Sequence, residues 1–141
     1  EKRWEAVNAS GYEIINDSYN ANPESMRAFV DTVFELYENY NLILGDMGEL
    51  GENEIEYHRE LGRYINSKQN LNPNAYVISI GELSKNITSE IKNCKTAHFD
   101  TVEQVVPFVK SNILQGSLIF LKASRSMKFE RIIEALGAFG V

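Results

Sequence analysis

Three polar segments of the chain carry side chains that could bind a charged ligand. The first spans residues 17–22 and offers a carboxylate, two amides and a phenol directly before Pro23. Amides and carboxylates can hold ribose hydroxyls or a purine edge, and a helix N-terminus favours an anion. The same residues also suit a structural turn in which Asn22 caps a helix. This segment alone leaves both interpretations open.

The second segment, residues 45–51, has glycines at every third position among acidic side chains. The spacing differs from the dinucleotide fingerprint, and no Gly-Lys-Ser or Gly-Lys-Thr of a P-loop occurs in the chain. Asp46, Glu49 and Glu52 could bind Mg²⁺ or orient a substrate ammonium, or could form a solvated acidic turn. His58 follows in a predicted helix, where it could face the ligand or be packed and hydrogen-bonded.

The third segment, residues 122–127, is the most cationic strand exit in a chain whose net charge is −6. Arg125 has the fork geometry that suits a carboxylate or a phosphate. Ser124 and Ser126 can add hydroxyl donors, although Ser126 could instead cap the last helix. Binding and structural roles both remain open for these residues.

Short apolar runs that alternate with amphipathic helices predict an α/β fold with a mostly parallel sheet. Two strand-like runs around Ser10-Gly11 predict an antiparallel hairpin at the sheet edge. Strands are predicted at residues 4–9, 12–16, 41–44, 75–80, 97–99 and 117–121. Helices are predicted at residues 23–37, 54–67, 83–93, 101–112 and 128–136, the last ended by Gly137. Because parallel strands end on one edge, where such sheets bind ligands, we expect the three polar segments to meet there.

Length and composition favour one compact domain over residues 1–141. The net charge of −6 argues against a nucleic-acid partner. No apolar run approaches a membrane span, and no signal peptide opens the chain. The single cysteine, Cys94, excludes a disulfide framework and a cysteine-based zinc site. These features predict a cytoplasmic protein, which we expect to be a monomer, and the first residue, Glu1, suggests a piece of a longer chain.

Together the three segments resemble the Mur ligases that join D-Ala-D-Ala to UDP-N-acetylmuramoyl-tripeptide. Residues 16–26 resemble that family's D-D-S-Y-N-A-N-P-x-S-M, and residues 44–51 match its L-G-D-M-x-E-L-G. Residues 122–127 resemble K-G-S-R-x-M, and His58 lies where the family has H-x-x-x-G. Asn16 and Ala123 replace a family Asp and Gly, and Lys2 replaces the Gly before Arg3. Since Ala123 replaces Gly, that turn is not expected to need a glycine-only backbone conformation.

The resemblance implies the C-terminal domain of such a ligase, a Rossmann-like sheet with helices on both faces. The N-terminal domain, which binds the UDP-sugar, and the central ATPase domain, which holds the P-loop and the Mg²⁺ ligands, would be absent from this chain. The implied cofactors are therefore ATP and Mg²⁺, both held mainly by the absent central domain. The implied reaction, in peptidoglycan precursor synthesis, proceeds through an acyl phosphate that the amine of D-Ala-D-Ala attacks. The isolated domain is expected to be inactive.

By family position, the resemblance implies two groups of binding residues and neither a metal ligand nor a catalytic residue in this domain. The ATP side would comprise Arg3, Asp17, Tyr19, Asn20 and Asn22. The D-Ala-D-Ala side would comprise Asp46, Glu49, His58, Ser124 and Arg125.

Two other functional classes compete with this hypothesis. A receiver-like phosphoacceptor domain would explain the acidic strand exits at Asp17 and Asp46 and the late Lys122. It lacks the expected acidic pair after the first strand and leaves the Asn-Ala-Asn-Pro segment unexplained. The other class is a stand-alone nucleotide-binding or interaction module.

Overall fold

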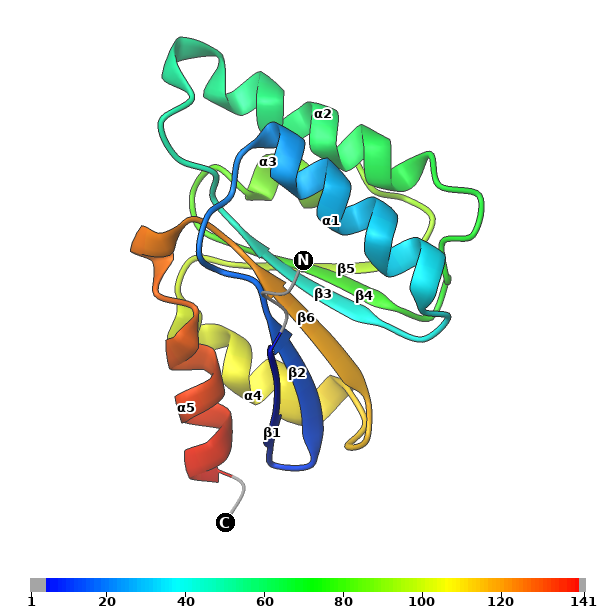
Figure 1. Cartoon of the computed structure of the whole chain (residues 1–141), viewed down its shortest axis with the longest axis vertical. Coiled ribbons are helices and arrows are strands. Elements are labelled where there is room, and N and C mark those ends of the chain that lie inside the picture. The colour runs from blue at the N-terminus through cyan, green and yellow to red at the C-terminus, as the bar shows by residue number, and fades with distance from the viewer. Residues whose placement is uncertain (1–4, 140–141) are drawn as a thin grey trace.

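The sheet of this protein is mixed, as the sequence predicts. The computed structural model describes residues 5–139, so the hypotheses about Arg3 and about a strand start at Trp4 lie outside the described residues. Within that range one sheet has the strand order β1-β2-β6-β3-β4-β5 (Figure 1). The strands are β1 Glu5–Ala9, β2 Tyr12–Asn16, β3 Asn41–Gly45, β4 Tyr76–Ile80, β5 Lys95–Phe99 and β6 Leu118–Lys122.

The predicted hairpin is confirmed, because β1 and β2 pair antiparallel. Ser10 and Gly11 between them both have positive φ, 56° and 84°, as two-residue turns with the twist of a hairpin require. The remaining pairs, β2 with β6, β6 with β3, β3 with β4 and β4 with β5, are parallel. The carboxyl ends of five strands therefore lie on one edge of the sheet.

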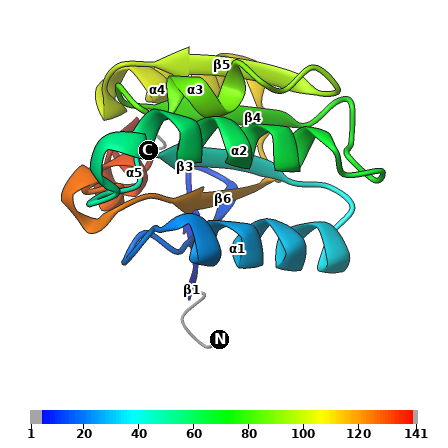
Figure 2. The same ribbon diagram turned by 90° about the horizontal axis from the view of Figure 1, so that it is seen from above.

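Helices cover both faces of the sheet, which confirms the predicted layers. Helices α1 (Pro23–Leu36), α2 (Glu54–Asn66) and the short α3 (Lys85–Thr88) lie on one face, and α4 (Val102–Asn112) and α5 (Glu130–Phe139) on the other (Figure 1). Seen from above, α1 and α2 run along the same face and α3 lies beside α2 (Figure 2).

Two hydrophobic cores follow from the alternation of side chains along buried strands. Leu42 and Leu44 of β3 join the core under α1 and α2, whereas Ile43 joins the core over α4 and α5. Phe120 and its neighbour Ile119 on β6 divide in the same way. No helix in the part of the chain that the structure describes is long and apolar enough to cross a membrane.

The helix predicted at residues 83–93 is wrong in length, because α3 covers only Lys85–Thr88. After Thr88 the backbone makes three-residue turns, and the amides of Lys92 and Asn93 donate to Oδ1 of Asn66 at 2.8 and 3.1 Å. Because these two amides bind the Asn66 side chain at the end of α2, they are not available for helical hydrogen bonds. The edge strand β5 begins at Lys95 and is two residues longer than the predicted residues 97–99.

The last helix also differs from its prediction at residues 128–136. Lys128 has a left-handed φ of 55°, so α5 begins only at Glu130. Gly137 does not end the helix, which continues to Phe139. Because Gly137 does not have the positive φ of a helix-terminating glycine, it behaves as an ordinary helical residue.

Candidate functional site

The three polar segments meet at the carboxyl edge of the sheet, as predicted. They follow β2, β3 and β6, and β6 lies between the other two strands. The amide of Asp17 donates to the carbonyl of Leu121 at 2.8 Å, and that of Ser124 donates to the carbonyl of Asp46 at 3.1 Å. These backbone hydrogen bonds join the first segment to the end of β6, directly before the third segment, and join the third segment to the second.

The first segment ends in a well-formed helix cap. Oδ1 of Asn22 accepts a hydrogen bond from the amide of Ser25 at 2.8 Å, and Oγ of Ser25 accepts one from the amide of Asn22 at 3.0 Å. This capping box starts α1 and confirms the structural interpretation of Asn22. Tyr19, which is 65% exposed, and Asn20 are the side chains of this segment that face solvent.

Lys122 is the residue of this edge whose role sequence analysis missed. It is only 3% exposed. Its Nζ donates to Oδ2 of Asp17 at 3.0 Å and to the carbonyl oxygen of Asn20 at 2.9 Å. A lysine that directly continues the apolar run of β6 is a signal that could have revealed this, since a buried ammonium needs partners.

The glycine-rich segment is held by tight contacts and left-handed residues. Glu49 and Gly51 have φ values of 57° and 74°. A Cβ on Gly45 would lie 2.6 Å from Cβ of Ala123 and 2.7 Å from Cζ of Phe129, so glycine is needed for this close approach. Ala123 itself does not have a positive φ, which confirms that its turn does not need glycine.

His58 on α2 is fully buried and binds the backbone of the glycine-rich segment. Its Nε2 accepts a hydrogen bond from the amide of Met47 at 3.0 Å, and its Nδ1 lies 2.7 Å from the carbonyl oxygen of Glu54. These contacts require a neutral ring with the proton on Nδ1. Both ring nitrogens are thus engaged by backbone groups, which gives His58 a role in positioning the loop.

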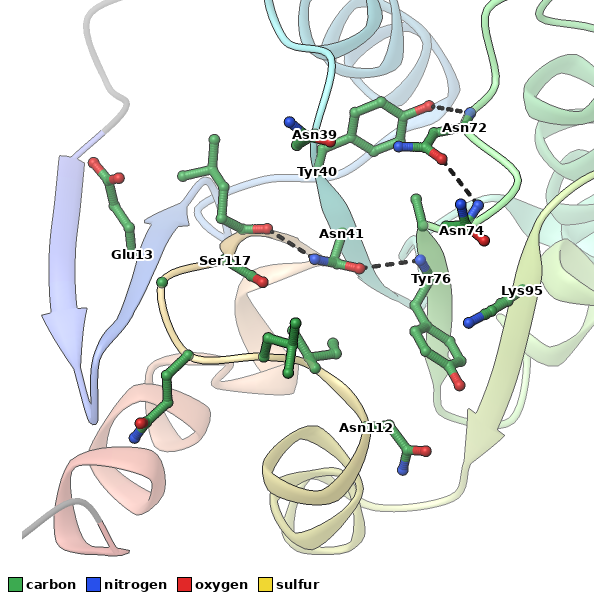
Figure 3. Close-up of a pocket in the computed structure, with 16 residues that line it drawn as sticks. Glu13, Asn39, Tyr40, Asn41, Asn72, Asn74, Tyr76, Lys95, Asn112 and Ser117 are labelled. Atoms are coloured by element: carbon green, nitrogen blue, oxygen red, sulfur yellow. Dashed lines mark hydrogen bonds between the residues drawn. The ribbon is translucent and has the colours of Figure 1, made fainter.

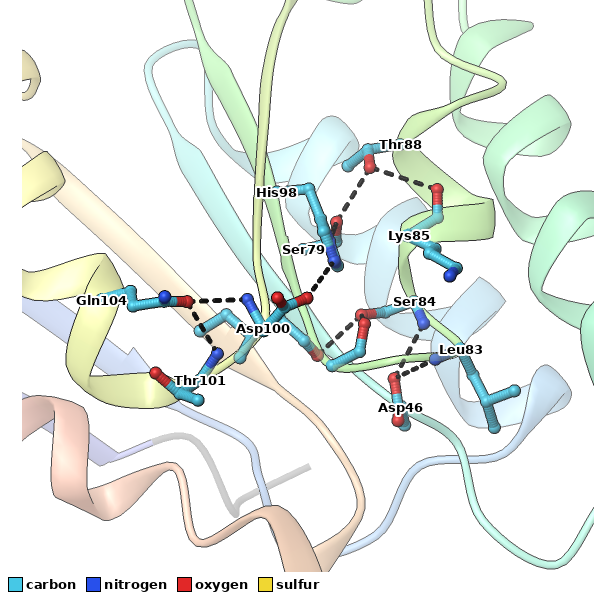
Figure 4. A network of polar contacts seen from close by, with 12 residues as sticks. Asp46, Ser79, Leu83, Ser84, Lys85, Thr88, His98, Asp100, Thr101 and Gln104 are labelled. Atoms are coloured by element: carbon cyan, nitrogen blue, oxygen red, sulfur yellow. Dashed lines mark hydrogen bonds and ion pairs between the residues drawn. The ribbon is translucent and has the colours of Figure 1, made fainter.

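Asp46 also binds backbone groups. Its Oδ1 accepts hydrogen bonds from the amides of Leu83 at 3.1 Å and Ser84 at 2.8 Å (Figure 4). Gly81, with a φ of 116°, lies so close that a Cβ there would be 2.6 Å from this oxygen. Asp46 therefore ties the glycine-rich segment to the turn after β4, while the exposed Glu49 reaches solvent beside it.

Arg125 and Tyr19 lie against each other across the edge. The guanidinium carbon of Arg125 is 4.9 Å from the centroid of the Tyr19 ring, a cation–π geometry. Beside them, the hydroxyl oxygens of Ser124 and Ser126 are 3.2 Å apart. The structure thus brings together residues that the resemblance assigns to opposite ligand sides.

Within residues 5–139, no three His, Cys, Asp or Glu side chains are placed to hold a metal ion. Asp17 is paired with Lys122, and one oxygen of Asp46 is bound to amides. Asn16, which stands where the family has Asp, leaves a buried Oδ1 without a partner among the described residues.

A Ser–His–Asp arrangement lies beneath the turn after β4. Oγ of Ser79 is 2.6 Å from Nδ1 of His98 and 2.8 Å from Oγ1 of Thr88, and Nε2 of His98 is 3.6 Å from Asp100 (Figure 4). Ser79 is 0% exposed, so a substrate cannot reach its hydroxyl. The arrangement joins β4, β5 and α3 and does not form a nucleophilic site.

A groove of about 700 Å³ opens at the opposite edge, where the parallel strands begin (Figure 3). Its amides mainly bind neighbouring strands: Asn41 accepts from the amide of Tyr76 at 3.0 Å and donates to the carbonyl of Leu118 at 3.2 Å. Tyr40 likewise accepts from the amide of Asn72 at 3.0 Å. Despite its size, this groove is the weaker candidate, because sheets of this type bind ligands at the carboxyl ends of strands.

Comparisons with known proteins show which family this chain belongs to. A family model described as the Mur ligase, glutamate ligase domain, matches residues 2–125. UDP-N-acetylmuramoyl-tripeptide–D-alanyl-D-alanine ligase of Bacillus subtilis is 35% identical over 129 residues, 90% of this chain and 28% of the relative. The ligase of that name from Buchnera aphidicola of Baizongia pistaciae is 38% identical over 140 residues, 96% of this chain and 29% of the relative.

A solved structure is similar as well. The MurF ligase from Thermotoga maritima in complex with ADP is 28% identical, with a TM-score of 0.71 over 96% of this chain and 30% of that one. The chain therefore spans less than a third of the length of each of these three proteins.

Proposed function

We propose that this chain, which belongs to the Mur ligase family, is the C-terminal domain of an ATP-dependent ligase that joins D-Ala-D-Ala to UDP-N-acetylmuramoyl-tripeptide. One observation carries the proposal. The three segments that resemble this ligase are far apart in sequence, yet hydrogen bonds join them at the edge where α/β sheets bind ligands: Lys122 donates to the first segment, and the amide of Ser124 donates to the second. We assign the N-terminal and central domains to the remainder of the full-length protein.

The proposed reaction has two steps. The terminal carboxylate of the tripeptide attacks the γ-phosphorus of ATP, which gives an acyl phosphate and releases ADP. The free amine of D-Ala-D-Ala then attacks the acyl carbon, loses a proton, and the tetrahedral intermediate expels phosphate to leave an amide. Positioning and charge stabilisation account for most of the acceleration of such steps, and these are what a domain that contacts both substrates can contribute.

On the nucleotide side, we assign contacts to the first segment. Tyr19 and Asn20 are exposed and offer a ring face and an amide to the nucleoside. Asp17 and Asn22 act mainly by shaping the segment, through the ion pair with Lys122 and the helix cap. Mg²⁺, which would neutralise phosphate charge, is assigned to the absent central domain, and Arg3 keeps its proposed contact with the ATP phosphates.

On the dipeptide side, the cationic and hydroxyl groups of the third segment suit a carboxylate. Arg125 is exposed, and Ser124 lies next to it, so both can donate to the carboxylate of D-Ala-D-Ala. Glu49 and the remaining oxygen of Asp46 can face the ammonium, while His58 positions the loop that carries them. We place the reaction in the cytoplasm, where ATP is available, and propose that the protein acts as a monomer.

The proposal is tested with the full-length protein and purified substrates. Phosphate release is expected only when ATP, Mg²⁺, the UDP-linked tripeptide and D-Ala-D-Ala are all present, together with one new amide product by mass spectrometry. The isolated chain is expected to turn over no ATP. Absence of the amide product with all substrates present would contradict the ligase, and covalent labelling of Asp46 by acetyl phosphate and Mg²⁺ would support a receiver domain instead.

A further inference from the structure

The ammonium group of Lys122 is enclosed at the carboxyl edge. The side chain of Lys122 is 4% exposed, and that of its ion-pair partner Asp17 is 18% exposed. Lys122 lies opposite Leu44 of β3 and faces α1, where its Nζ is 5.8 Å from the centroid of the Phe29 ring. A charge held away from water stays ionised only when oxygen atoms replace its hydration shell.

Three oxygen atoms of the first segment replace that shell. Nζ lies 3.0 Å from Oδ2 of Asp17, 2.9 Å from the carbonyl oxygen of Asn20 and 3.5 Å from the carbonyl oxygen of Asp17. With these oxygens around it and its side chain almost fully enclosed, the ammonium cannot serve a ligand directly. Any influence of Lys122 on a ligand must pass through the segment it binds.

The contacts of Lys122 bracket Tyr19. Asp17 and Asn20 lie on either side of the Ser18-Tyr19 dipeptide, so one ammonium fixes both ends of this short stretch. Between these two anchors Tyr19 turns outward, 65% exposed, against the guanidinium of Arg125. The direction of the Tyr19 ring therefore depends on a lysine that follows β6, more than 100 residues later in the sequence.

We propose that Lys122 is a positioning residue for nucleotide binding, which holds Tyr19 and Asn20 in the arrangement that receives ATP. The inference rests on the proposed function, because it assumes that the first segment contacts the nucleotide. It extends that function by giving two different roles: Tyr19 and Asn20 contact the nucleotide, and the buried ammonium of Lys122 orients them.

The test uses the full-length enzyme with Lys122→Met, which keeps the length of the side chain and removes its charge. The KM for ATP is expected to rise about 10- to 100-fold, the loss typical of charged hydrogen bonds. The factor by which the KM for D-Ala-D-Ala rises is expected to be at least five times smaller than the factor for ATP. A purely structural defect lowers the amount of active enzyme and thus the apparent kcat, but it leaves both KM values unaltered. Lys92→Met is the matched control, since Lys92 is exposed and its Nζ contacts only the carbonyl of Ser89 among the described residues.

A second variant covers the case in which Lys122→Met does not fold. Lys122→Arg keeps the charge, but a planar guanidinium cannot place one donor atom among the same three oxygens, so the KM for ATP is expected to rise about threefold or more. An unchanged KM for ATP in either folded variant would overturn the positioning role. Failure of both variants to fold would also overturn it, because Lys122 would then be a folding determinant. Failure of the proposed function can be distinguished from failure of the positioning role, because in the first case the wild-type enzyme would show no ligation.

Discussion

Replacing Gly62 by alanine is expected to destabilise this protein, although alanine normally favours a helix. Gly62 lies on the buried face of α2, one turn after His58. An added Cβ would be 2.2 Å from the carbonyl oxygen of Ile87 and 2.9 Å from Cβ of Glu90. A backbone oxygen cannot rotate away, so α2 and α3 would have to separate by roughly 1 Å to restore ordinary contact.

The expected loss follows from two opposing terms. Alanine for glycine inside a helix contributes about 0.5–1 kcal/mol of stability. Overpacking typically costs about 1–3 kcal/mol, and a clash with backbone belongs at the upper end. The net effect of Gly62→Ala is a loss of about 2 kcal/mol, which for a domain of this size lowers Tm by roughly 4–8 °C.

The same substitution at Gly137 is the matched control. Gly137 is exposed within α5, and nothing lies within 4 Å of a Cβ added there. Gly137→Ala is therefore expected to raise Tm by about 1–3 °C through helix propensity alone. Thermal unfolding followed by circular dichroism measures both variants. A Gly62→Ala variant as stable as the Gly137→Ala variant would refute the close packing of α2 on α3.

Three further outcomes are expected. His58→Phe leaves the buried amide of Met47 unpaired and should cost about 1–3 kcal/mol by denaturant unfolding, so unchanged stability would contradict the loop-positioning role. Burial raises the pKa of the Cys94 thiol from 9.0 to about 11, which stabilises the fold below pH 9 and loses that effect as the pH rises toward 11. A thiol reagent at pH 8 should then react with the folded chain roughly 100-fold more slowly than with the chain in guanidinium, and equal rates would be inconsistent with a suppressed thiolate. Hydrogen bonds from Lys68 and Tyr64 lower the pKa of Asp31, so their stabilisation is present above the ordinary value of 3.8 and is lost as the pH falls below it. Asp31→Asn should therefore make Tm fall less steeply as the pH drops below 3.8. The change in the free energy of unfolding should be less than about 1 kcal/mol, because the Asp31 side chain is half exposed. A dependence of Tm on acid pH that equals the wild type's would exclude this contribution.

The convergence of the three polar segments was predictable from the sequence. Each segment follows an apolar run, and parallel strands must end on one edge of a sheet. The sequence also indicated the Asn22 cap and the hairpin at Ser10-Gly11, because these depend on neighbouring residues. Local sequence patterns of this kind predict the observed structure when no distant side chain competes for the same backbone groups.

The features that sequence analysis missed depend on distant partners. The end of α3 is set by the side chain of Asn66, and the direction of Tyr19 by Lys122. Asp46 and His58 were candidate ligand contacts. The pairing of β3 with β4 brings backbone amides to Asp46, and the loop before α2 brings the amide of Met47 to His58. The insertion of β6 between β2 and β3 is a long-range pairing that no local pattern contains.

The most direct test of the proposed site is the effect of Arg125→Ala on substrate binding in the full-length enzyme. Loss of one charged hydrogen bond costs about 1.5–3 kcal/mol, so the KM for D-Ala-D-Ala is expected to rise roughly 10–150-fold and more than the KM for ATP. Arg59→Ala, at an exposed position on α2, is the control and should leave both values unchanged. A KM for D-Ala-D-Ala that stays at the wild-type value in Arg125→Ala would contradict a dipeptide site at this edge of the sheet.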